Sequence, residues 1–253
     1  MLETGSLKIR ALAAAGFLLL IGGPAAGAEG PVMQARANND VGNVASLQRG
    51  VRNFVNYCMG CHSAKYVRYN RLAEDLGITE EELIENLMFA AEKPYETMEI
   101  AMPSADAERW FGQAPPDLSL IARARGTDYL FNFLRSFYVD EARPTGVNNL
   151  VLPNLSMPHV LWELQGTQRA VFETEASDGA PRTVFKDFEV VRPGKLSPEE
   201  YDAFIRDIVN FLDYIGEPMQ LQRQRIGVLV IAFLVFFGIL SYLLKQEIWK
   251  DVD

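Results

Sequence analysis

The stretch Cys58-Met59-Gly60-Cys61-His62 constrains this 253-residue chain more than any other feature. It contains both cysteines of the sequence, two residues apart, and a histidine follows the second directly. This spacing is the attachment pattern of c-type haem, in which each thiol bonds one vinyl group of the porphyrin and the imidazole reaches the iron. The sequence therefore predicts one covalently bound haem c, held by Cys58 and Cys61, with His62 as an axial iron ligand.

The number of cysteine and histidine residues disfavours other uses of the two thiols. A structural zinc site needs four nitrogen or sulfur ligands, usually from two paired motifs. The chain holds two cysteines and two histidines, and His159, the second histidine, belongs to no second motif. A thioredoxin-like redox pair is expected within a βαβ pattern, and none is visible around these residues.

The amino terminus has the pattern of a secretory signal peptide. Lys8 and Arg10 precede the apolar stretch 11–23, and small residues follow up to Ala28. The apolar run is interrupted by Pro24 and is shorter than the roughly 20 residues that a membrane-spanning helix needs. We therefore expect cleavage after Ala28 and export of the mature chain.

The carboxyl terminus contains the stretch "IGVLVIAFLVFFGILSYLL", residues 226–244, which has no charged residue. This length is sufficient to cross a bilayer, and basic residues on both sides leave the positive-inside rule without a preference. The signal peptide sets the orientation instead. We expect a signal peptide (1–28), a periplasmic haem domain (29–222), a transmembrane anchor (223–246) and a cytoplasmic tail (247–253).

The net charge of the chain indicates which class of partner it can bind. The whole chain has a formal charge of −9, and removing the signal peptide with Lys8, Arg10 and Glu3 makes it −10. Such an acidic chain is not expected to bind nucleic acid, and it favours a basic partner protein.

Hydrophobic periodicity predicts a mainly α-helical domain. Capping boxes mark two helix starts, one at Thr79 and Glu82 and one at Ser197 and Glu200. The expected helices cover residues 47–58, 79–92, 127–138 and 197–216, and the last is expected to pack on the first. Residues 102–119 and 143–159 are predicted to be long loops without helix or strand, and 173–195 a β-hairpin.

The sixth iron ligand is not determined by these patterns. Met98, Met102, Met157 and His159 are the available candidates. Both Met102 and Met157 precede a proline, which restricts the backbone before it to extended geometry, so local sequence does not separate them. A methionine gives a closed electron-transfer centre, and His159 would give a bis-histidine haem of lower potential.

Three long segments resemble the cytochrome c1 family, the haem subunits of cytochrome bc1 complexes. They are "RGVRNFVNYCMGCHSAKYVRYNRL", "WFGQAPPDLSLIARARGTDYLFNFLRSFY" and "NLVLPNLSMPHVLWELQG". The resemblance is to bacterial members and covers nearly the whole mature chain. It implies a class I cytochrome c-like haem domain with long loops, followed by one C-terminal transmembrane helix.

The resemblance also implies site residues. Met157 becomes the distal iron ligand, ahead of Met102. Arg125 matches an arginine near a haem propionate, and Tyr129 matches an aromatic contact. The prolines along the porphyrin edge correspond to Pro115 and Pro116. Some family members carry an additional disulfide. This chain has no cysteine left for one, so we expect packing alone to hold the distal loop.

The implied function is one-electron transfer within ubiquinol–cytochrome c oxidoreductase, in which the chain alone is not an enzyme. A Rieske iron–sulfur protein is the expected donor and a c-type cytochrome the acceptor. Cytochrome b and membrane lipid are further expected partners, in a dimer of heterotrimers at the bacterial inner membrane. The alternative is another membrane-anchored monohaem cytochrome that serves an oxidase or a periplasmic dehydrogenase. A haem enzyme or gas sensor with an open distal position is a third possibility.

Overall fold

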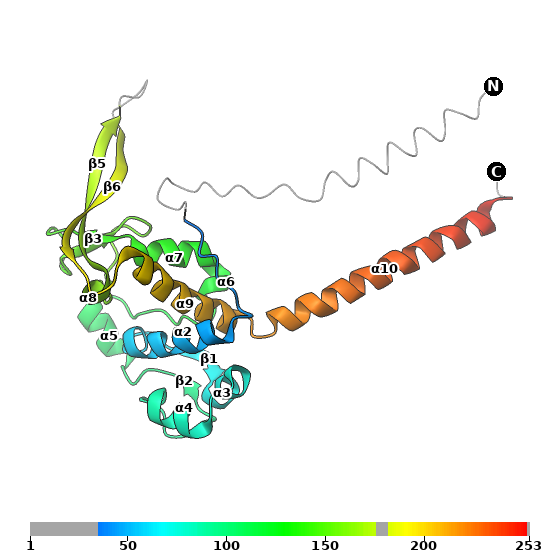
Figure 1. The fold of residues 1–253 in the computed structure, drawn as a ribbon, viewed down its shortest axis with the longest axis horizontal. Coiled ribbons are helices and arrows are strands. Elements are labelled where there is room, and N and C mark those ends of the chain that lie inside the picture. Colours follow the sequence, from blue (N-terminus) through cyan, green and yellow to red (C-terminus); the bar gives the residue numbers. More distant parts are fainter. Residues whose placement is uncertain (1–34, 176–181, 252–253) are drawn as a thin grey trace. The chain divides into compact units, whose positions relative to one another are not determined.

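The computed structural model describes residues 35–175 and 182–251. The predicted signal peptide (1–28) and residues 252–253 of the predicted tail lie outside this range. The predicted architecture is confirmed, because the chain is mainly helical, with long loops and one C-terminal apolar helix (Figure 1). The elements are α2 (Val44–Tyr57), β1 (Ala64–Arg68), α3 (Tyr69–Leu76), α4 (Glu80–Asn86), β2 (Thr97–Met98), α5 (Ser104–Phe111), α6 (Ile121–Arg125), α7 (Thr127–Arg135), β3 (Phe137–Val139), β4 (Val147–Asn149), α8 (Trp162–Gln165), β5 (Gly166–Glu175), β6 (Arg182–Pro193), α9 (Pro198–Gly216) and α10 (Gln220–Trp249).

Helices α2 and α9 pack side by side, as predicted (Figure 1). They approach closely at Gly50, where an added Cβ would lie 2.2 Å from the carbonyl oxygen of Asp207. Phe54 of α2 and Phe211 of α9 are both fully buried, with ring centroids 5.3 Å apart. This pairing fixes the end of α2, and Cys58 is the residue that caps it.

Both predicted capping boxes are present, at Thr79 for α4 and at Ser197 for α9. Helix α4 is nevertheless shorter than predicted and ends at Asn86 rather than near residue 92. The side chain of Asn86 donates to the carbonyl of Glu82 (3.0 Å), and Leu87 leaves the helical conformation. Asparagine competes in this way with the backbone hydrogen bonds that would extend a helix.

The helix predicted over residues 127–138 also ends early. Helix α7 stops before Ser136, and Phe137 begins strand β3, where it pairs with Asn149 of β4. The Ser136 hydroxyl contacts the Phe133 carbonyl (3.3 Å) and the Asn149 side chain (3.1 Å). These contacts join the end of α7 to β4, which the hydrophobic periodicity of residues 127–138 could not indicate.

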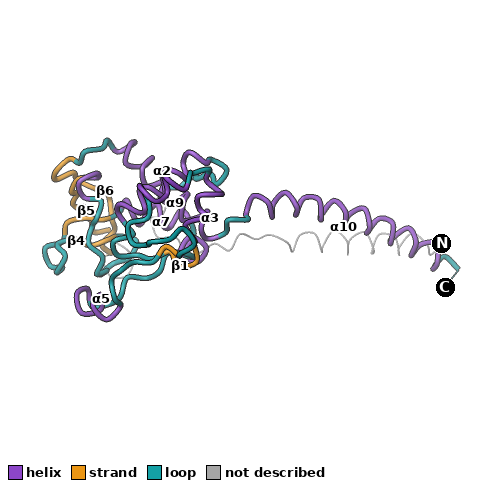
Figure 2. Tube along the Cα trace, turned by 90° about the horizontal axis from the view of Figure 1, so that it is seen from below, coloured by secondary structure: helices purple, strands orange, loops and turns teal. Residues whose placement is uncertain are grey.

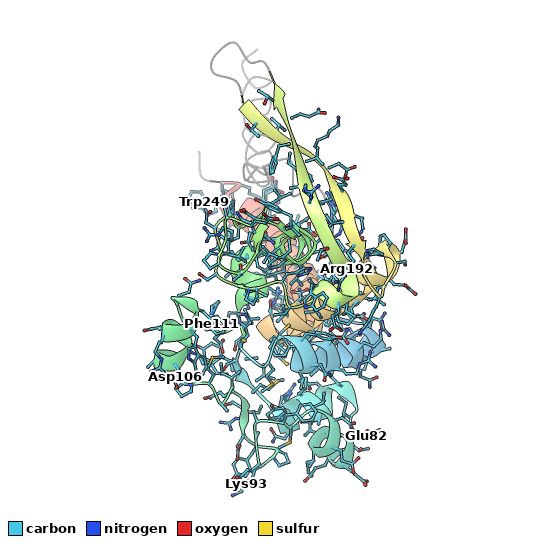
Figure 3. All side chains as sticks on the ribbon, turned by 90° about the vertical axis from the view of Figure 1, so that its left-hand side faces the viewer. Glu82, Lys93, Asp106, Phe111, Arg192 and Trp249 are labelled. Atoms are coloured by element: carbon cyan, nitrogen blue, oxygen red, sulfur yellow. The ribbon has the colours of Figure 1, made fainter. Side chains whose placement is uncertain are left out.

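The two segments predicted to be long loops each contain regular structure, so that prediction was wrong in part. Residues 104–111 form α5, which carries Asp106 and Phe111 (Figure 3), and residues 147–149 form β4. An ion pair between Asp106 and Arg109 (2.6 Å) supports α5. Gly112, at a φ of 79°, ends the helix. Flanking proline and glycine residues concealed this short helix in the sequence.

The predicted hairpin is confirmed and is longer than expected, since its first strand begins at Gly166. Strands β5 and β6 pair antiparallel (orange in Figure 2), and β5 also packs against β3. The Gln168 side chain donates to the carbonyls of Arg135 (2.9 Å) and Phe137 (2.8 Å). The base of the hairpin is thereby attached to the end of α7 and to β3.

Helix α10 contains the predicted membrane segment 226–244. It has 30 residues with a hydropathy of 2.7 in its most apolar window, and none of its residues is buried. At about 1.5 Å per residue such a helix is longer than the hydrocarbon core of a bilayer, which is about 30 Å thick. Within the described residues, α10 is the one helix that is long and apolar enough to cross a membrane.

Candidate haem site

An apolar cavity of about 270 Å³ lies at the end of α2, between α7, α9 and two loops. Six of its lining side chains are aliphatic residues of α6, α7, α9 and the loop before α6: Leu118, Ile121, Leu130, Leu134, Ile208 and Leu212. All eight residues that the sequence predicted for the site also line this cavity: Cys58, Cys61, His62, Pro115, Pro116, Arg125, Tyr129 and Met157. The fold therefore brings together segments that are about 100 residues apart in the chain.

The two cysteines lie in a tight turn that directly continues α2. The Cys58 amide donates to the Phe54 carbonyl (2.8 Å), and the amides of Cys61 and His62 donate to the Cys58 carbonyl at 3.0 Å and 2.9 Å. Both thiols are free and partly buried. Burial, followed by the nearby Cys61, raises the pKa of the Cys58 thiol to about 12. Two free thiols thus face one apolar cavity, which suits addition to vinyl groups.

His62 is held at the cavity wall by a loop carbonyl. Its Nδ1 atom lies 2.8 Å from the carbonyl oxygen of Pro116. Burial lowers the pKa of His62, while the bond to Pro116 and the charge of Asp117 oppose this shift. A neutral imidazole that donates from Nδ1 keeps its Nε2 lone pair available for a metal.

The candidates for the opposite ligand differ in their position. Met157 lines the cavity together with its neighbours Ser156 and Pro158. Neither Met102 nor His159 is among the described residues that line it. His159 is instead buried against Phe137, with the two rings stacked at a centroid distance of 4.7 Å. Met98 is fully buried in strand β2.

The loop that carries Met157 is held by hydrogen bonds as well as by packing, so the expectation of packing alone was wrong. The Arg143 guanidinium donates to the backbone carbonyl of Asn154 (2.9 Å). Asn154 itself has a φ of 64°, in the left-handed region. The amides of Val151 and Leu152 both donate to the side chain of Asn149, at 2.9 Å and 3.1 Å.

Arg125 and Tyr129 lie together at the cavity. The guanidinium of Arg125 is 5.6 Å from the centre of the Tyr129 ring, within the range of a cation–π contact. Arg125 is exposed and forms no ion pair within the described part of the chain. The Tyr129 ring stacks on Phe133 at 6.3 Å with an interplanar angle of 9°. The side chain of Arg125 is thus available to an anionic group at the cavity edge.

Sequence reasoning missed several cavity residues. Phe133 was recognised only as part of a helical aromatic pattern, and Ile208 and Leu212 only as the apolar face of α9. Leu152 and Leu155 lie in a segment where no periodicity is visible. The sequence did contain a signal for Phe133, Ile208 and Leu212. They lie on apolar helix faces, and an apolar face that packs beside Cys58 is also expected to face a cofactor held by Cys58.

The donor set fits a covalently held haem. Two free thiols, an imidazole whose Nδ1 is already bonded and a thioether sulfur face a cavity whose walls are otherwise apolar. Cys, His and Met are the residues that hold haem iron and its vinyl groups in c-type sites. An exposed arginine at the edge suits the carboxylates of the same group.

Comparison with known proteins gives a family. The chain matches the Cytochrome C1 family over residues 39–99 and 86–252. It is 51% identical over 244 residues to a cytochrome c1 of Allochromatium vinosum, which covers 96% of this chain and 100% of that relative. A relative from Nitrosomonas europaea, named ammonia monooxygenase gamma subunit, is 42% identical over 217 residues, or 86% of this chain and 88% of its own. A mitochondrial cytochrome c1, heme protein, of Saccharomyces cerevisiae is 28% identical over 228 residues, 82% of this chain and 67% of its own. The family match includes every residue of the cavity described above.

Proposed function

Because the chain belongs to the cytochrome c1 family, we propose that it is the electron-transfer subunit of a membrane-bound cytochrome bc1 complex. It accepts one electron from a Rieske iron–sulfur protein and passes it to a c-type cytochrome. The chain alone is not an enzyme, and the complex is a quinol–cytochrome c oxidoreductase. The observation that carries this proposal is the single cavity that gathers Cys58, Cys61, His62 and Met157.

Each cavity residue has a specific role in this proposal. Cys58 and Cys61 would hold one haem c through two thioether bonds, and His62 and Met157 would ligate its iron. When bound, the haem supplies a one-electron Fe(III)/Fe(II) couple. Ligation by histidine and methionine leaves no open position for substrate, which suits electron transfer and not oxygen chemistry.

The surrounding side chains set the environment of this centre. The aliphatic wall excludes water and lowers the local dielectric, which favours the iron state of lower charge and raises the reduction potential. Arg125 pairs with a propionate, and Tyr129 orients that arginine through the cation–π contact. Pro115 and Pro116 pack along the porphyrin edge, and the Pro116 carbonyl orients His62.

The location follows from the two ends of the chain. The signal peptide exports the mature protein, and α10 anchors it in the bacterial inner membrane as a single-pass helix, with the haem domain in the periplasm. In this location the chain contacts lipid and cytochrome b. The complex is a dimer of heterotrimers made of cytochrome b, the Rieske protein and this chain.

A second candidate function is supported by the Nitrosomonas relative, whose name is that of an ammonia monooxygenase subunit. A chain of the same family could therefore carry electrons for another membrane enzyme. The two functions share the haem site and the anchor, and they differ in the proteins that accompany the chain.

Purification of the tagged full-length chain from its native membrane in mild detergent tests the proposal. We expect b-type haem and a Rieske iron–sulfur signal to co-purify, and quinol to reduce the haem c in the complex. Isolation without b-type haem, together with no reduction by quinol, would contradict the assignment and favour the second candidate. A Met157→Leu complex provides a control, since it keeps the partners and loses the proposed ligand.

A further inference from the structure

The segment that carries Met157 begins at strand β4. Between Asn149 and Met157 the chain forms no helix or strand. Four residues of this segment line the cavity: Leu152, Leu155, Ser156 and Met157. A segment without a backbone ladder must be fixed by other contacts if it is to place a side chain accurately.

Asn149 supplies two of these contacts, at the start of the segment. Its side chain is fully buried, and its Oδ1 accepts the amides of Val151 (2.9 Å) and Leu152 (3.1 Å) and the Ser136 hydroxyl (3.1 Å). Its Nδ2 donates to the carbonyl of Phe133 (2.8 Å), in the last turn of α7. One buried amide therefore joins the first turn of the Met157 segment to a helix that lines the cavity.

Asn148 makes a second attachment farther along. Its side chain is 6% exposed, and its Oδ1 accepts the amides of Asn149 (2.9 Å) and Asn154 (2.8 Å). Its Nδ2 donates to the Asp140 carboxylate (2.9 Å), at the end of β3. The two neighbouring asparagines thus bind the backbone at residues 151, 152 and 154, just before Met157.

We propose that Asn149, assisted by Asn148, is a positioning residue that holds the Met157 segment at the cavity and so determines how firmly the methionine sulfur stays on the iron. This inference rests on the proposed ligation by Met157. A ligand on an ordered segment binds without the entropy loss of fixing a mobile one. The amides of residues 151 and 152 lose their protein partner when the Asn149 side chain is replaced, so this part of the segment is no longer tied to α7.

The test uses the full-length holoprotein in detergent and measures competition by cyanide at the ferric haem. Cyanide must displace the methionine, so its apparent dissociation constant reports how easily the sulfur leaves. The midpoint potential and the methionine-to-iron charge-transfer absorption are recorded on the same samples. Asn149→Leu removes all four hydrogen bonds at nearly constant volume, and Asn148→Leu removes the second attachment.

Asn210→Leu is the matched control. Asn210 is 1% exposed and also joins buried groups, donating to the Asp40 carbonyl (2.7 Å) and contacting the Ser46 hydroxyl (3.0 Å). Among the described residues, its side-chain hydrogen bonds go to Asn39, Asp40 and Ser46 and not to the Met157 segment. Its loss is expected to lower thermal stability without changing cyanide binding, which separates positioning from a general structural role.

We expect Asn149→Leu to lower the cyanide dissociation constant about tenfold, with a lower midpoint potential and a weaker charge-transfer band. Asn148→Leu should cause a smaller change. If Asn149→Leu does not fold, Asn149→Asp keeps the Oδ1 acceptor and replaces the bond to Phe133 by a contact between two oxygen acceptors, and a shift of the same sign supports the inference.

An Asn149 variant that carries haem and keeps the wild-type cyanide affinity and potential would overturn the inference. A change of equal size in Asn210→Leu would overturn it as well. Met157→Leu serves as the reference. If it leaves cyanide binding unchanged, the ligation by Met157 fails, and this outcome is distinct from a failure of Asn149 alone.

Discussion

The Nδ1 atom of His62 lies 2.8 Å from the carbonyl oxygen of Pro116. A carbonyl oxygen can only accept, so Nδ1 must carry the proton and the neutral ring keeps its lone pair on Nε2. Burial of the ring also favours this neutral form, since it lowers the pKa of His62. One loop residue thereby fixes both the tautomer and the ring orientation that an iron ligand needs.

Met157→Leu tests the ligand opposite His62. Leucine keeps the volume of the side chain and removes the sulfur, so we expect the midpoint potential of the haem to fall strongly and the reduced protein to bind carbon monoxide. Redox titration and the spectrum of the reduced protein under carbon monoxide measure these effects.

Met102→Leu is the control for this substitution, because Met102 precedes a proline as Met157 does and does not line the cavity. We expect it to leave the potential unchanged. The reverse pattern, with a loss of potential only in Met102→Leu, would move the ligand to Met102. An unchanged potential in both variants would point to His159.

Covalent attachment is tested by Cys58→Ser and Cys61→Ser. The chain has no other cysteine, so each single variant should keep one thioether bond and the double variant none. Acid–acetone extraction is expected to release haem only from the double variant. The alkaline pyridine spectrum should shift stepwise with each free vinyl group. Haem that stays bound in the double variant would show a different mode of attachment.

Local patterns predicted the parts of the site that depend on contiguous residues. The turn at Cys58 and His62 follows from five consecutive positions, and the start of α9 follows from the capping box of Ser197 and Glu200. These features depend on neighbours in the chain, which a sequence shows directly.

Features that depend on distant contacts were not predictable in this way. Phe137 lies in strand β3 and not in a helix, because the Asn149 side chain of β4 accepts a hydrogen bond from the Ser136 hydroxyl and donates one to the Phe133 carbonyl at the end of α7. Sequence alone did not separate Met157 from Met102, because both precede a proline. Only the fold places one of them at the cavity. Asn149 itself has no local signature, since its partners are determined by how the loop folds back.

The capping box of α4 predicts a pH effect on stability. The Glu82 carboxylate accepts from the backbone amide and the hydroxyl of Thr79, and these hydrogen bonds lower the pKa of Glu82 from its ordinary value of 4.5. A lowered pKa means that the stabilisation is complete above 4.5 and is lost as the pH falls through the folded value. We expect Glu82→Gln to be less stable than wild type at neutral pH, and the difference to disappear as the pH falls below the folded-state pKa of Glu82.

Chemical denaturation of both proteins across this pH range measures the difference. Glu81→Gln is the control, since Glu81 is an exposed residue in the first turn of the same helix and its side chain makes no hydrogen bond within the described residues. A deficit of Glu82→Gln that persists at acidic pH would show that the carboxylate charge is not its cause.

Gly50→Ala tests the crossing of α2 and α9. An added Cβ would lie 2.2 Å from the Asp207 carbonyl oxygen and 2.7 Å from the Phe211 Cβ, and both atoms are fixed to the α9 backbone. Alanine favours an isolated helix over glycine by about 1 kcal/mol. Overpacking of this kind costs about 1–3 kcal/mol, so the helices must separate and we expect a net loss of stability.

Arg52→Ala, on the exposed face of α2, is the control for that substitution and should change stability by less than about 0.5 kcal/mol. Thermal unfolding of the holoprotein compares the two. Because α2 ends at Cys58 and α9 lines the cavity, separation of the helices should also lower the yield of protein with covalently bound haem. A Gly50→Ala protein as stable as wild type would show that the two helices can shift apart at little cost, and that this contact does not fix the position of the attachment turn.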